Sequence, residues 1–145
     1  MSKGNIFENE LLEHILNNAN IINIGDATGL RGSAAAGSLY ISLHTADPGE
    51  AGSQTANECA YTSYARVAIA RSGALWTVTG NSASPASEIS FPTATGGLET
   101  ATHFAVGTSV SGAGKVLYSG TVTPNIVIAS GVTPKLTTAS TITED

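Results

Sequence analysis

The chain has 145 residues and a mass of 14.6 kDa, which suits one domain with a real core and is too short for two large ones. Six Lys and Arg against eleven Asp and Glu give a net charge of −5, and the basic residues are scattered, so no basic stripe exists to neutralise the phosphates of a nucleic acid. The longest purely apolar runs have four residues, far short of the ~20 that a membrane-spanning helix needs. We therefore expect neither a nucleic-acid-binding protein nor a membrane protein.

Charged residues make up only 12% of the chain, against roughly 25% in an average soluble domain. Gly, Ser, Thr and Ala take their place. The sequence therefore predicts a surface on which large contacts with other proteins can form without burying unpaired charged side chains. The single cysteine, Cys59, cannot form an internal disulfide, and the amino terminus lacks the apolar segment of a secretory signal. We expect synthesis and assembly in a reducing cytoplasm.

One amphipathic helix is predicted near the amino terminus. Asn5 is a candidate N-cap, and apolar residues fall on one half of the helical wheel up to an end near Asn18. So short a helix is marginal alone, so its apolar face needs a partner in this domain or in another subunit. We predict that Phe7, Leu11 and Ile15 form an intersubunit contact.

After the helix, residues 25–38 carry four glycines and indicate a loop or mobile linker. The rest is predicted to be β: about eight short strands bounded by Gly and Pro and rich in Thr and Val. The fold class expected is mainly β, an antiparallel jelly roll or β-sandwich with one N-terminal helix. We divide it into a helix and Gly-rich arm, residues 1–38, and a β-sandwich domain, residues 39–145, within one compact domain. The expected strands are 39–44, 64–69, 75–79, 88–91, 101–108, 115–119, 121–123 with 125–129, and 135–143.

Three histidines, His14, His44 and His103, could in principle form a zinc site. No two of them have the spacing that places ligands together on one element, so they are interpreted as surface or interface histidines that hydrogen-bond locally. Asp47 near His44 could suggest a catalytic dyad, but no nucleophile elbow is present and Asp47 belongs to an Asp-Pro-Gly turn. We predict no metal, no cofactor and no catalytic residues.

Two glycine-rich segments could suggest phosphate or dinucleotide binding, and neither fits. Residues 25–32 have neither a strand immediately before them nor a helix after them, as a dinucleotide-binding turn requires. Residues 112–115 read Gly-Ala-Gly-Lys, but Ser109 replaces the leading glycine of a phosphate loop and Val116 its Ser or Thr, so a hairpin turn is predicted. Cys59 has no nearby base and lies beside Glu58, which raises a thiol pKa, so it is interpreted as unreactive. A carbohydrate site would use exposed aromatic residues, yet packing is the simpler role for all five candidates, with Trp76 in the core. These candidates are Tyr40, Tyr61, Tyr64, Trp76 and Tyr118.

Several blocks in register resemble a family of small tailed-bacteriophage virion proteins. The main one is residues 39–50, LYISLHTADPGE, followed by Tyr64-Ala65-Arg66-Val67. Residues 8–16, ENELLEHIL, residues 89–92, ISFP, and residues 102–107, THFAVG, match the same family in the same order, so the resemblance covers nearly the whole chain. Members of this family are often labelled tail-fibre-like, and relatives are similar to capsid cement proteins that form jelly-roll trimers on the head.

The resemblance implies a non-enzymatic structural component of a bacteriophage virion. Because the chain is short and lacks long-period repeats, it does not read as a fibre shaft, and a capsid decoration or cement protein is the leading hypothesis. Its expected partners are the major capsid protein and further copies of itself in a homotrimer, at the outer surface of the capsid. The alternative is a tail or tail-fibre-associated structural or adsorption protein, and a small hydrolase or lectin-like domain is the remote third.

Overall fold

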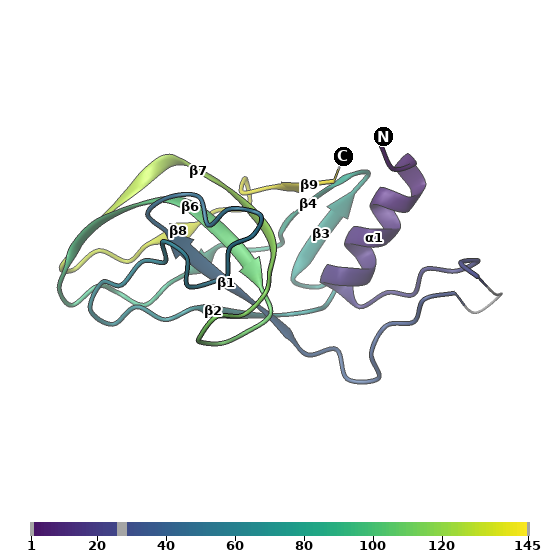
Figure 1. The fold of residues 1–145 in the computed structure, drawn as a ribbon, viewed down its shortest axis with the longest axis horizontal. Coiled ribbons are helices and arrows are strands. Elements are labelled where there is room, and N and C mark those ends of the chain that lie inside the picture. Colours follow the sequence, from purple (N-terminus) through teal and green to yellow (C-terminus); the bar gives the residue numbers. More distant parts are fainter. Residues whose placement is uncertain (1, 26–28, 145) are drawn as a thin grey trace. The chain divides into compact units, whose positions relative to one another are not determined.

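The computed structural model describes residues 2–25 and 29–144. Its fold is mainly β, with one N-terminal helix and antiparallel sheets consistent with a β-sandwich, so the predicted fold class is confirmed (Figure 1). No helix within these residues is long and apolar enough to cross a membrane. The elements in chain order are α1 (Asn5–Asn17), β1 (Ser38–His44), β2 (Val67–Ala70), β3 (Trp76–Thr79), β4 (Ser82–Pro85), β5 (Ile89–Ser90), β6 (Leu98–Gly107), β7 (Val116–Ala129), β8 (Lys135–Leu136) and β9 (Ile142–Thr143).

The chain forms two compact units, each built from segments distant in sequence. The first comprises residues 1–38, 70–87 and 138–145, and the second residues 39–69 and 88–137. The predicted division at residue 38 into an arm and a β domain stays a prediction, although residue 38 is also where the first unit's opening segment ends.

The first unit packs α1 against the sheet β3-β4-β9. Gly80 and Asn81 join β3 to β4 as a two-residue hairpin loop, and Gly80 takes φ +59°, which costs glycine no Cβ clash. Leu12, Leu16 and Trp76 are buried here, so the expected core position of Trp76 is confirmed. β4 was not predicted, because Ser82–Pro85 offers only small residues where a strand signal needs large apolar ones.

The second unit is organised around the sheet β2-β1-β6-β7, with β5 and β8 paired separately. β1 lies inside this sheet, and every residue from Ile41 to His44 is buried, so both of its faces are covered. Leu39, Ile41 and Leu43 alternate in the sequence with more polar residues, which suggests one open face, but the burial of Ser42 and His44 shows that the second face is covered as well.

β7 is an edge strand that continues through Pro124, where the sequence predicted a break. Ala101 pairs with Ile126 and His103 with Thr121, so residues 122–125 of β7 lie opposite Thr102 alone. A bulge of this kind on an edge strand accommodates a proline, because no ladder hydrogen bond requires its missing N–H.

Candidate interaction surface and supporting sites

The helix α1 carries the residues that the sequence proposes for an interface. It begins at Asn5, so the predicted N-cap is wrong: Gly4 occupies the cap position without a side-chain hydrogen bond. Asn18 ends the helix in the left-handed conformation with φ 59°, as expected from its position. Arg71 satisfies acceptors at the carboxyl end of α1, because its guanidinium donates hydrogen bonds to the carbonyl oxygens of His14 and Ile15.

Only one of the two apolar stripes of α1 is buried. Leu12 and Leu16 are fully covered, whereas Phe7 is 37% exposed and Leu11 and Ile15 are half-buried. A helix that packs on a sheet buries the stripe of side chains that faces the sheet, whereas the neighbouring stripe lies at the side of the helix and is only partly covered. The predicted contact residues therefore line a partly open face, and their role as an interface stays a prediction.

The chain after α1 adds further exposed apolar side chains to the first unit. Asn18 fixes this segment by exchanging two 2.8 Å hydrogen bonds with the backbone of Ser33, and Ile21 and Leu30 form an antiparallel bridge. Residues 26–28 of the predicted glycine-rich linker lie outside the described residues. We call the exposed apolar residues of this part of the chain the N-terminal apolar surface: Ile6, Phe7, Ile22, Ile24 and Leu30.

Most other hypotheses about chemistry concern the second unit, where His44 and His103 are paired across β1 and β6. His44 is fully buried, so its predicted surface position is wrong, although its local hydrogen bonding is confirmed. Its Nδ1–H donates to the Ala56 carbonyl at 2.8 Å, so Nε2 accepts from the Ser42 hydroxyl, also at 2.8 Å. Ser42 is buried as completely as His44, so this Ser–His pair has no solvent-facing side for a substrate.

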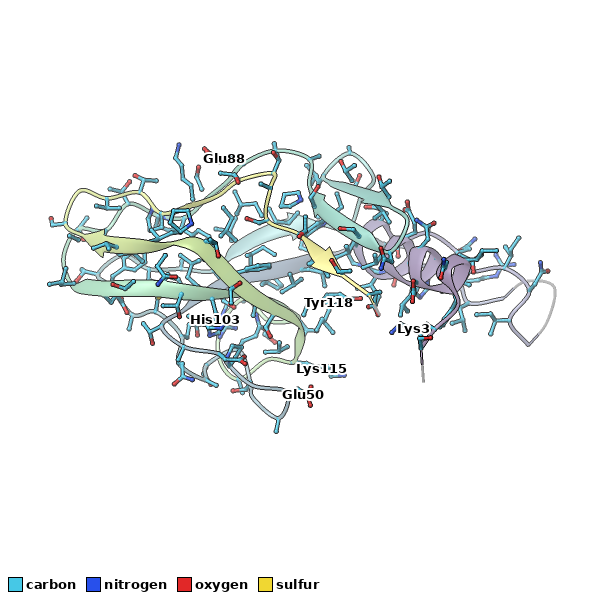
Figure 2. The ribbon with its side chains drawn as sticks, turned by 90° about the horizontal axis from the view of Figure 1, so that it is seen from above. Lys3, Glu50, Glu88, His103, Lys115 and Tyr118 are labelled. Atoms are coloured by element: carbon cyan, nitrogen blue, oxygen red, sulfur yellow. The ribbon has the colours of Figure 1, made fainter. Side chains whose placement is uncertain are left out.

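The His44–His103 proximity does not extend to a metal-ligand cluster. His103 donates through Nδ1 to the Thr102 hydroxyl, and both ring nitrogens of His44 are already hydrogen-bonded. Within the described ranges, no three His, Cys, Asp or Glu side chains gather in an arrangement that could hold a metal ion. His103 is labelled in Figure 2.

The sequence analysis missed a buried ion pair between Glu58 and Arg66. Arg66 Nε and Nη2 donate to the two carboxylate oxygens of Glu58 at 2.7 and 2.8 Å, with the Arg66 side chain 3% exposed and that of Glu58 15% exposed. Arg66 also donates to the carbonyls of Ser109 and Gly112, both at 2.8 Å, and so fixes the hairpin loop between β6 and β7. The only sequence signal was an arginine inside a predicted strand, next to apolar residues.

Gln54 completes the support of this loop, and it lies against Gly114 of the segment that resembled a phosphate loop. The buried Gln54 accepts from the Ser109 N–H at 2.9 Å and donates to the Tyr40 carbonyl. A Cβ on Gly107 or Gly114 would lie 2.0 to 2.2 Å from atoms of the Gln54 side chain, so a larger residue at either position would displace the hydrogen-bonded Gln54 amide. The predicted hairpin is confirmed, since β6 and β7 are antiparallel neighbours.

The remaining candidates are packed. Burial raises the pKa of Cys59 to about 12, with Glu99 and Glu58 adding to the effect, so its expected lack of reactivity has a physical cause. Tyr64 donates to Glu58 and accepts from the Leu43 N–H, and burial raises its pKa. None of the five aromatic residues considered for sugar binding is exposed.

A pocket of about 270 Å³ beside the ion pair is lined by Glu58, Tyr64, Ala65, Arg66, Val110, Ser111 and Gly112.

Replacing Arg66 with Met should lower the free energy of unfolding by about 3–5 kcal/mol, because it leaves the Glu58 carboxylate unpaired and two loop carbonyls without donors. Chemical denaturation measures this change. Lys135→Met, at an exposed ion pair with Glu88, is the matched control and should cost less than about 1 kcal/mol. Equal losses in the two variants would contradict a structural role for the buried pair.

A second prediction concerns acid. Burial lowers the pKa of His44 below 6.5, against smaller opposing effects from the Ala56 carbonyl and Glu58. As the pH falls through about 6.5, this histidine becomes protonated in the unfolded chain while it stays neutral in the folded chain. The contribution of His44 to the free energy of unfolding is therefore fully present above about pH 6.5. Below that pH the free energy of unfolding falls, by up to about 1.4 kcal/mol per pH unit. Urea denaturation across this window should show the slope in wild type and in His103→Gln, and lose it in His44→Gln. A slope that persists in His44→Gln would assign the effect to another group.

Comparison with known protein families gives one match. The family model described as podophage GP4 fiber I protein gp80 matches residues 2–143. The chain belongs to this family, which is a family of phage structural proteins. No curated protein matches the chain.

Proposed function

We propose that this member of the podophage fiber I family is a non-enzymatic structural component of the tail fibre, held in the virion by its N-terminal apolar surface. The family match over residues 2–143 is the observation that carries the proposal. The fibre description favours the tail, which the sequence analysis had ranked second.

The distribution of exposed apolar side chains supports attachment through the first unit. Five of the nine large apolar side chains exposed among the described residues lie within residues 6–30. Exposed apolar side chains that concentrate in one segment of the chain support a contact with another protein there. The net charge of −5 and the low content of ionic groups fit such a contact, because few ions have to be desolvated.

A capsid decoration role is the second candidate, and one observation favours it. The sequence has no long-period repeat, so the chain offers no shaft-forming segment of its own. In that role the protein would bind the major capsid protein at the outer surface of the head, as a homotrimer. Both candidates place the protein in the virion and differ in where its partner lies.

Immunogold electron microscopy of purified virions distinguishes the two locations. We expect label at the tail and none on the head, and native mass spectrometry should show a homotrimer. Label distributed over the capsid would replace the tail proposal with the decoration role. Absence of the protein from purified virions would overturn both.

Replacing Leu11 with Asp tests the part of the attachment surface that lies on α1, because Leu11 follows Phe7 by one helical turn and lies on the same face of the helix. A carboxylate on the half-buried stripe of α1 should abolish incorporation into particles and leave the β-type circular dichroism unchanged, because Leu12 and Leu16 still hold the helix on its sheet. Leu98→Asp, at a residue 79% exposed in the second unit, is the control and should incorporate normally. Loss of folding in Leu11→Asp would make this stripe part of the core, and normal incorporation would remove it from the interface.

A further inference from the structure

The buried imidazole of His44 is bonded to a loop segment that follows β1 in the second unit. His44 is fully buried, and its Nδ1–H donates to the Ala56 carbonyl at 2.8 Å. The backbone of His44 also forms an antiparallel bridge with Glu58. We call residues 53–58, which make both contacts, the covering segment. The side chain and the backbone of one histidine therefore hold this segment against the end of β1.

The covering segment in turn holds the loop between β6 and β7, residues 108–115. Gln54 is fully buried, and its side chain accepts a hydrogen bond from the Ser109 N–H at 2.9 Å. The backbone N–H of Gln54 donates to the Ala113 carbonyl at 2.7 Å. All of these residues belong to the second unit, so the contacts lie within one packed body. Movement of the covering segment away from β1 removes these contacts from the loop.

The hydrogen-bond partners of the His44 ring suit its neutral form. Nδ1–H donates to the Ala56 carbonyl, and Nε2 accepts from the hydroxyl of Ser42, which is also fully buried. A protonated ring carries a hydrogen on both nitrogens, so the Ser42 hydroxyl has to turn and accept. Neither partner carries a negative charge, so the ring's own hydrogen bonds do not neutralise an imidazolium.

The charged and titratable groups around the ring do not neutralise it either. They are Glu58 in the covering segment, Arg66 just before β2, and His103 on β6. Arg66 and His103 oppose a positive charge on His44, and Glu58 favours one. Both carboxylate oxygens of Glu58 already accept from Arg66, however. Because a buried cation without a counter-charge is costly, protonation of His44 favours an arrangement that admits water to the ring.

We propose that His44 is an acid-sensitive switch: protonation of its ring releases the covering segment and, through Gln54, frees the loop between β6 and β7. The opening is local, because the covering segment is a loop, whereas the other neighbour of β1 is β6, which pairs with it over five residues from Tyr40 to His44. At neutral pH both loops are held, and in acid both can move. The switch lies in the second unit and does not depend on where the protein is located in the virion.

Native-state hydrogen exchange at pH 7 and pH 5 tests the switch, with rates corrected for the intrinsic pH dependence of amide exchange. An exposed histidine has a pKa near 6.5 and burial lowers the pKa of His44, so the opening equilibrium rises by up to about 25-fold between these pH values. The amides of Thr45, Gln54 and Ser109, which bond across the opening, exchange faster by this factor. Low concentrations of urea leave their rates unchanged, because a local opening exposes little surface.

Variants separate the two steps of the switch. In His44→Gln, which cannot take up the proton, these amides exchange equally at both pH values, whereas His103→Gln retains the difference. In Gln54→Ala the Thr45 amide keeps its pH dependence, and the Ser109 amide exchanges fast at both pH values because its acceptor is gone. An unchanged Ser109 amide in Gln54→Ala would contradict the coupling between the two loops.

Two further results would overturn the switch. One is the absence of a pH-dependent change in wild type, which decides the question even if His44→Gln fails to fold, or a change that persists in His44→Gln. The other is a urea dependence of the Thr45 and Gln54 amides equal to that of the β6 amides, since the histidine would then take up its proton only on global unfolding.

Discussion

Arginine pairing with backbone carbonyls is the interaction on which both units depend. The chain has only six basic residues, and two of them are used inside the protein. Arg66 joins Glu58 to the carbonyls of Ser109 and Gly112 in the second unit, and Arg71 binds the last carbonyls of α1 in the first. A guanidinium suits this task because its planar set of five donors can satisfy several acceptors at once.

This internal use of arginine has a consequence for the surface. Few cations remain at the surface, so a contact through the exposed apolar residues near the amino terminus, as proposed above, would require few ion pairs to be desolvated. The stability of the second unit rests on an ion pair that water hardly reaches. Salt therefore screens that pair much less than it would screen a surface pair.

Secondary-structure elements that depend on local patterns could be predicted from the sequence, whereas burial and side-chain pairing that depend on tertiary contacts could not. Periodicity located α1 and most strands, since a 3.6-residue or two-residue repeat is visible in a short window. It could not show that β1 is covered on both faces, which buries His44, because that depends on strands far away in sequence. The pairing of Glu58 with Arg66 and the packing of Gln54 against Gly107 were invisible for the same reason.

The edge strand β7 explains why contacts through side chains suit this protein better than contacts through its sheets. β7 contains no charged residue, and an uncharged edge strand of 14 residues is a template for uncontrolled pairing with other chains. Pro124 and the bulge at residues 122–125 interrupt its hydrogen-bonding row near the middle. The opposite edge, β2, has only four residues. With both edges of this four-stranded sheet blunted, uncontrolled strand pairing with other chains is disfavoured, which fits a virion subunit that has to stay free of aggregates.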